Sequence, residues 1–257
     1  MKRHADGSAG DADYGTIAQG YPDYRRPDPR IAAVIDQALG DAVTVLNVGA
    51  GAGSYEPRNR SVTAVEPSAS MRARRPPDLP PAIDAVAQAL PFADATFDAA
   101  MATFSVHQWP DLARGLAEMR RVTRGPVLVL TADPLLVTAF WLGRYAPEVL
   151  AVEARRYPPI DRIASALGAR SQVLPVPIPR DCTDGFQEAY FGRPEMVLDP
   201  AARNACSAWS FVDSPVIRRL ETELARDLAT GRWDERYGPL RTAPAFDGSL
   251  RLIVGRD

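Results

Sequence analysis

An apolar segment that runs into closely spaced glycines is the feature that most constrains this chain of 257 residues. The segment VTVLNV at 43–48 is followed by Gly49, Gly51 and Gly53. Glycine has no Cβ, so the backbone of such a turn can lie close to a bound small molecule. A second apolar run ends in Glu66, and an acid at the tip of the neighbouring strand is where doubly wound folds hold ribose hydroxyls. The pattern predicts a site for a nucleoside-containing cofactor.

The spacing of the glycines indicates which class of cofactor. The dinucleotide fingerprint is G-x-G-x-x-G, whose last glycine lets the helix pack close to the strand. Here the spacing is G-x-G-x-G, and Ser54 stands at the position of the third dinucleotide glycine. This argues against a nicotinamide or flavin dinucleotide, although a glycine-rich turn alone is a weak signal.

The segment that follows makes the signal specific. Residues 86–98, VAQALPFADATFD, closely resemble the A-E-x-L-P-F-x-D-x-x-F-D signature of class I S-adenosylmethionine-dependent methyltransferases of the type 11 subgroup. The resemblance covers about residues 14–133 in the order of the family, including the segments at 99–102, 105–109, 112–122 and 127–131. It implies S-adenosylmethionine as the cofactor and methyl transfer as the reaction.

The alternation of segments predicts the fold. Apolar runs near 43–48, 62–65, 82–86, 97–103 and 127–131 are separated by helical segments, which is the βαβ pattern of a parallel sheet. Edge and closing strands are expected at 171–178 and 249–254, and the resemblance implies that the last one runs antiparallel. We therefore expect an α/β fold with a doubly wound, seven-stranded, mostly parallel sheet of the Rossmann-like type. Helices are expected at 31–39, 112–122, 139–156, 160–167 and 215–229. A further helix should begin at Ser68, which is a suitable N-cap residue.

About 70 residues separate the last two expected strands, far more than a hairpin loop needs. We interpret this insertion as a mainly helical cap over the methyl group of the cofactor, with a dimerisation element as the alternative. The expected organisation is a disordered N-terminus at 1–13, a cofactor-binding core at 14–133, a helical segment with an edge strand at 134–178, the inserted cap or substrate region at 179–246, and the closing strand at 247–257.

Composition narrows the function classes. The net charge is -2 and no basic run occurs, so a nucleic-acid partner is not expected. No apolar run is long enough to cross a bilayer and the N-terminus is polar, which favours a cytoplasmic protein without a membrane partner. Two cysteines without CxxC spacing and two histidines indicate neither a metal site nor a disulfide framework. A monomer or homodimer is expected.

The resemblance also implies which residues hold the cofactor. The glycines permit close approach and Glu66 binds the ribose. Gln88 replaces the usual acid near the adenine, yet its amide still offers an acceptor. Asn47 replaces an acid near the ammonium group, and Arg25 or Arg26 pairs with the carboxylate. The full set is Tyr14, Arg25, Arg26, Asn47, Gly49, Ala50, Gly51, Gly53, Glu66, Pro67, Met71, Ala87, Gln88, Ala89 and Thr103.

For the chemistry, His107 follows the fourth expected strand, at the sheet edge where such folds bind ligands. An imidazole ordinarily titrates near pH 6.5, so we expect His107 to act as general base, or else to pack as pocket wall beside Trp109. The candidate substrate-binding residues are Trp109, Cys182, Tyr190 and Trp209. The predicted function is methyl transfer by in-line displacement to an oxygen, nitrogen or carbon of a small-molecule acceptor. The alternatives are a nicotinamide- or flavin-dependent oxidoreductase and a non-catalytic S-adenosylmethionine-binding protein.

Overall fold

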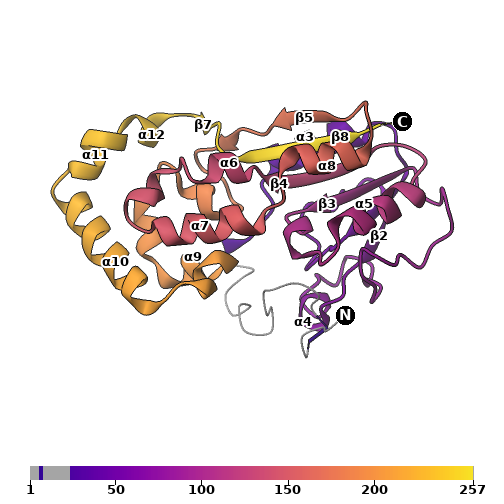
Figure 1. The fold of residues 1–257 in the computed structure, drawn as a ribbon, viewed down its shortest axis with the longest axis horizontal. Coiled ribbons are helices and arrows are strands. Elements are labelled where there is room, and N and C mark those ends of the chain that lie inside the picture. Colours follow the sequence, from indigo (N-terminus) through magenta and orange to yellow (C-terminus); the bar gives the residue numbers. More distant parts are fainter. Residues whose placement is uncertain (1–5, 8–23, 257) are drawn as a thin grey trace.

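A six-stranded sheet forms the centre of the computed structural model, which describes residues 6–7 and 24–256 (Figure 1). The strands follow the order β2-β1-β3-β4-β8-β5. The first four run parallel, whereas β8 is antiparallel to both of its neighbours. The bounds are β1 Thr44–Val48, β2 Ser61–Val65, β3 Ala99–Thr103, β4 Val127–Ala132, β5 Gln172–Pro175 and β8 Leu250–Gly255. The predicted antiparallel closing strand is confirmed. Tyr14 and nearly all of the predicted disordered N-terminus lie outside the described residues.

One of the seven predicted strands, the one at 82–86, is not formed. Only Ile83 pairs with β2, through a single parallel bridge to Val65. Its N–H donates to the Ala64 carbonyl at 2.9 Å, and its carbonyl accepts from Glu66 N at 3.0 Å. The preceding residues are Pro80 and Pro81, and proline has no N–H to donate to a ladder. The segment is therefore extended beside β2 without becoming a strand.

Helices cover both faces of the sheet, as a doubly wound fold requires. Helix α3 (Pro29–Leu39) packs its apolar side on Val45, Met101 and Leu128 of one face. On the other face, α5 (Leu112–Arg121) and α8 (Ile160–Leu167) pack on Leu46, Ala100 and Val129. Neighbouring residues of one strand thus lie in opposite cores, which follows from the two-residue period of a β-strand.

Short helices and turns connect these elements near the sheet edge. Ser68 caps α4 (Ala69–Arg72) by accepting from Met71 N, as predicted. The helix predicted at 139–156 is instead broken into η2 (Trp141–Arg144) and α7 (Pro147–Arg156), after α6 (Pro134–Val137). Pro147 occupies the first turn of α7, and proline is tolerated there but not in a helix interior. The break therefore lies at Ala146.

The insertion and the segment after β4 form a helical region at one end of the elongated molecule (Figure 1). Its buried residues belong to the same core cluster as those of α3. Within the region, the ring of Trp141 from the segment after β4 lies 5.5 Å from that of Trp233 in the insertion. The predicted strand at 171–178 is split, because only β5 joins the large sheet and Ile178 pairs with Phe246. The remaining elements are η1 Val106–Gln108, β6 Ile178–Pro179, η3 Gln187–Tyr190, η4 Pro194–Leu198, α9 Pro200–Asn204, η5 Ser207–Phe211, α10 Ser214–Ala229, α11 Arg232–Tyr237, α12 Pro239–Thr242 and β7 Ala245–Phe246.

Candidate active site

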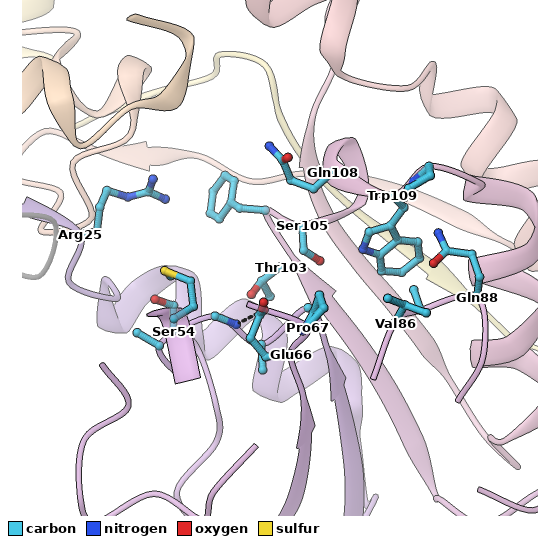
Figure 2. A pocket seen from close by; sticks show the side chains of 18 residues that line it. Arg25, Ser54, Glu66, Pro67, Val86, Gln88, Thr103, Ser105, Gln108 and Trp109 are labelled. Atoms are coloured by element: carbon cyan, nitrogen blue, oxygen red, sulfur yellow. Dashed lines mark hydrogen bonds between the residues drawn. The ribbon is translucent and has the colours of Figure 1, made fainter. Parts of the chain in front are cut away.

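A cavity opens at the carboxyl ends of β1, β2 and β3 (Figure 2). Here the chain leaves β1 toward one side of the sheet and β3 toward the other, which is where open α/β sheets bind ligands. Its empty volume is about 820 Å³. Eleven of the predicted site residues line it: Arg25, Gly49, Ala50, Gly51, Glu66, Pro67, Met71, Ala87, Gln88, Thr103 and Trp109.

The glycine turn forms one wall of this first cavity. Gly49 has φ +68°, and a Cβ at this position would lie 2.7 Å from the Cβ of Ser105. Neither the backbone angle nor the space therefore suits another residue. Gly49 N and Ala50 N both donate to the Val65 carbonyl, at 2.9 and 3.0 Å. The turn is thus held against the end of β2, with its backbone facing the cavity.

Glu66 lies at the end of β2 and is 7% exposed. Its Oε2 accepts from Gly51 N at 2.8 Å (Figure 2). Its Oε1 accepts from Ser68 N, also at 2.8 Å. Burial raises the pKa of this carboxyl, and the two backbone hydrogen bonds oppose that shift. Each carboxylate oxygen keeps a further lone pair. The side chain can therefore accept two more hydrogen bonds from a ligand in the cavity.

The far end of the first cavity combines an apolar wall with one amide. Gln88 is buried, and its Nε2 donates to the Asp111 carbonyl at 3.3 Å. This leaves its Oε1 as the acceptor. Trp109, predicted as a substrate residue, lies on the same side of the cavity as Gln88 (Figure 2). Its ring packs so close to Gly115 that a Cβ there would approach it to 2.6 Å.

Four of the described residues that were predicted to bind the cofactor do not line this cavity, namely Arg26, Asn47, Gly53 and Ala89. Ala89 is exposed. Gly53 has φ +96°, and its missing Cβ leaves room for Leu79 rather than for a ligand. Asn47 is fully buried, where its Nδ2 donates to Glu56 Oε1 at 3.0 Å. Arg75 binds both oxygens of the same carboxylate at 2.9 and 2.8 Å.

The structure distinguishes the two arginines that the sequence left equivalent. Arg25 lines the cavity and its Nε donates to Asp184 Oδ1 at 2.5 Å, whereas Arg26 is exposed. Asp184 is buried and also accepts from the hydroxyl of Tyr55 at 2.9 Å. The start of the insertion is therefore tied to the segment before α3 and to the glycine turn.

A second, smaller cavity of about 490 Å³ adjoins the first, and Arg25 and Phe104 line both. Phe104 follows β3 with φ +50°, a left-handed conformation that is strained for a bulky residue and is found most often at functional sites. The Phe104 ring lies 5.3 Å from the ring of Phe186, and the Arg25 guanidinium lies 5.5 Å from the centre of the Phe104 ring. Phe104 thus stands at the boundary of the two cavities.

Of the other predicted residues, His107 and Trp209 lie at or near this second cavity. His107 lines it, with its ring 4.8 Å from that of Tyr157, and does not line the first. Trp209 donates from Nε1 to Gln187 Oε1 at 2.7 Å, and Gln187 lines the second cavity. Cys182 and Tyr190 are buried and line neither. Burial raises the pKa of the Cys182 thiol to about 12, which makes it a poor nucleophile.

Sequence reasoning missed two residues that line the second cavity, Glu153 in α7 and Tyr157, which caps that helix. A signal was present, because Glu153 comes four residues after the buried Val149 and one turn of helix separates them. A carboxylate on the buried face of an amphipathic helix indicates a polar site. In the described residues there is no group of three or more His, Cys, Asp or Glu side chains that could hold a metal. None of the described helices is long and apolar enough to cross a membrane.

Comparisons with known proteins agree with this geometry. A family model described as a methyltransferase domain matches residues 46–129. The malonyl-[acyl-carrier protein] O-methyltransferase of Erwinia pyrifoliae is 38% identical over 121 residues, which are 42% of this chain and 46% of that protein. The chain thus matches about half the length of this curated relative.

Solved structures extend the likeness to nearly the whole chain. A protein assigned as a methyltransferase from an antibiotic biosynthesis pathway of Anabaena variabilis is 27% identical, with a TM-score of 0.84 over 91% of this chain and 100% of that one. The YcgJ protein of Bacillus subtilis has the same fold, at 15% identity and a TM-score of 0.52 over 89% and 98% of the two chains. With the glycine turn, the acid after β2 and the cavity between them, these matches identify a class I S-adenosylmethionine-dependent methyltransferase domain in this chain, with S-adenosylmethionine as its cofactor.

Proposed function

We propose that this protein transfers the methyl group of S-adenosylmethionine to an oxygen, nitrogen or carbon of a small-molecule acceptor by in-line displacement. The observation that carries the proposal is the first cavity, where the buried Glu66 carboxylate and the glycine turn face the same space. A second cavity adjoins it across Phe104. Two neighbouring spaces are what a reaction between a cofactor and a separate acceptor requires.

The residues of the first cavity fit this cofactor. Glu66 would accept from the two ribose hydroxyls, and Gln88 Oε1 would accept from the adenine amino group. Arg25 stands at the other end, where its guanidinium would meet the methionine carboxylate. Met71 and Pro67 supply apolar contacts between them. Asn47 and Gly53 would then support the packing of β1 and the glycine turn rather than contact the cofactor, and Ala89 would not contact it.

S-adenosylmethionine brings an activated methyl group on a sulfonium, so the protein needs mainly to align the acceptor and exclude water. The relative from an antibiotic biosynthesis pathway supports a small-molecule acceptor. Ser54 at the position of the third dinucleotide glycine disfavours the oxidoreductase alternative. We assign residues 14–133 and 247–257 to the cofactor core, 134–178 to its helical extension and 179–246 to the cap.

The experiment is isothermal titration with S-adenosylmethionine and with S-adenosylhomocysteine, with NADH fluorescence as the comparison. We expect both sulfur compounds to bind one per chain and NADH to give no change. Absence of binding by either sulfur compound would overturn the proposal. Light scattering after gel filtration tests the further expectation of a monomer or homodimer. The expected cytoplasmic location, without a nucleic-acid partner, is tested by fractionation and by filter binding.

A further inference from the structure

Among the residues that the structure describes, Glu153 supplies the one acidic side chain that lines the second cavity. Helix α7 buries Val149, Leu150 and Val152 in the core, and this arrangement carries Glu153 into the cavity wall. Within the described part of the chain, the Glu153 carboxyl makes neither a hydrogen bond nor an ion pair. An enclosed carboxyl without a protein partner is costly unless a ligand satisfies it.

Four aromatic rings contribute to the wall of the second cavity. Phe104, Tyr157 and Phe186 line it, and the His107 ring lies against that of Tyr157. Such walls favour a flat ring, which packs on aromatic faces in offset or edge-on geometry. The Gln187 amide, held by Trp209, adds one oriented polar group. The cavity thus combines aromatic rings with the Glu153 carboxyl and with the polar groups of Arg25, Gln187 and Ser207.

The charged surroundings of Glu153 set its proton affinity. Burial raises the pKa of this carboxyl to about 8 and Glu188 adds to the rise, whereas Arg156 and Arg25 oppose it. The other titratable groups that face the same space are His107, Tyr157 and Cys206. A carboxyl that takes up and releases a proton near neutral pH matches the requirement for a general base or acid at cellular pH.

We propose that the second cavity is the acceptor site, that it takes a flat aromatic molecule with an ionisable hydroxyl, and that Glu153, rather than His107, accepts the hydroxyl proton. This inference rests on the proposed function. The hydroxyl oxygen forms a bond to the methyl carbon while the carbon–sulfur bond breaks and its electron pair stays on sulfur. The proton passes to the Glu153 carboxylate and then to solvent. The products are an aryl methyl ether and the neutral thioether.

The first test measures binding without turnover. Protein loaded with S-adenosylhomocysteine is titrated with 2-naphthol, with naphthalene as the probe that lacks the hydroxyl. We expect 2-naphthol to bind at least about 10-fold more tightly than naphthalene, because a hydrogen bond to a charged or buried group contributes on that scale. Glu153→Leu should remove the difference. The matched control is Glu148→Leu on the same helix, whose carboxylate pairs with Arg219 at the surface.

The second test measures the pH dependence of methyl transfer to 2-naphthol. Wild-type turnover should rise with pH around a midpoint of about 8. Glu153→Gln should lower turnover by about 100-fold or more at pH 8, the scale of a lost general base. Its remaining activity should rise only toward pH 10, where a phenol-type hydroxyl ionises by itself. Glu148→Gln should keep the wild-type profile, and His107→Gln should keep its midpoint.

The outcomes separate this inference from the proposed function. If S-adenosylhomocysteine fails to bind, the proposed function fails. If it binds but 2-naphthol does not, or binds without being methylated, the acceptor assignment is overturned. The role of Glu153 is overturned if Glu153→Gln keeps wild-type turnover and midpoint, or if His107→Gln alone abolishes the rise near pH 8.

Discussion

Replacing Glu66 by glutamine tests the ribose site most directly. The carboxylate has two oxygens, each bound to one backbone N–H at 2.8 Å, and one free lone pair on each for a ribose hydroxyl. Glutamine keeps one oxygen and turns an NH₂ group toward one of those N–H donors. One backbone donor and one ribose hydroxyl therefore lose their acceptor. Since a hydrogen bond to a charged group contributes about 1.5–3 kcal/mol, cofactor affinity should fall by roughly 10- to 100-fold.

Stability should respond much less than affinity. The orphaned backbone N–H costs about 1–3 kcal/mol, but glutamine also relieves the burial of an acid whose pKa burial raises. These effects have opposite signs, so we expect the melting temperature to change by no more than roughly 5 °C, at about 2–4 °C per kcal/mol for a chain of this size.

The assay is isothermal titration with S-adenosylhomocysteine, beside thermal unfolding of the same samples. Asp78→Asn is the control, because Asp78 makes an exposed ion pair with Arg58 and does not line the cavity. We expect the Asp78→Asn protein to bind S-adenosylhomocysteine with the same affinity as the wild type. A folded Glu66→Gln protein that binds S-adenosylhomocysteine within about 3-fold of wild type would refute the ribose assignment.

Three further predictions concern the turn, the acceptor cavity and the cap. Gly49→Ala should lower the melting temperature by several degrees and weaken S-adenosylhomocysteine binding more than 10-fold. The control is Gly40→Ala, which should cost only backbone strain, because Gly40 also has a positive φ (+59°) but no heavy atom lies within 4 Å of a Cβ built there. Equal effects of the two substitutions in calorimetry and titration would contradict the packing argument. The pKa of the Glu153 carboxyl is about 8 in the folded protein against an ordinary 4.5, so its contribution to stability is fully present below pH 4.5 and is lost as pH rises through 8. The melting temperature of Glu153→Gln should therefore rise relative to that of the wild type across this pH range. A constant difference between the two melting temperatures would argue against this reasoning. Asp184→Asn leaves Arg25 without its buried partner and should cost about 3 kcal/mol, seen as a fall of roughly 10 °C in thermal unfolding; an unchanged melting temperature would show that this link does not stabilise the cap.

Local patterns were sufficient for the elements that lie on or beside the parallel sheet. Apolar runs with turn residues at their ends predicted β1, β2 and β4 to within a residue or two, and helix α8 at its observed bounds. Such elements bury one face or both against a single large core, so their pattern follows directly from that burial. The segment at 82–86 was predicted as a strand but formed only a single bridge. Its apolar residues suggested a strand, whereas the two prolines before it cannot donate to a strand ladder.

The location of the candidate cofactor cavity was predictable for the same reason. Its walls come from the chain directly after β1, β2 and β3, and the carboxyl ends of parallel strands meet at one edge of the sheet. Gly49, Glu66 and Gln88 therefore came together in the cavity. Asn47 and Gly53 lie close to Gly49 in the sequence but face Glu56 and Leu79 instead of the cavity. Asn47 belongs to β1, where successive side chains point to opposite faces.

The sequence by itself determined the sheet, its glycine turn and the class of cofactor, because each depends on short-range order and on a motif whose spacing carries its geometry. Only the tertiary structure decided which arginine reaches the cavity, that Trp109 lies with Gln88, and that Glu153 meets Phe104, although some fifty residues separate them. These contacts join segments distant in sequence. Their geometry depends on how the cap packs against the sheet, which no local pattern of residues encodes.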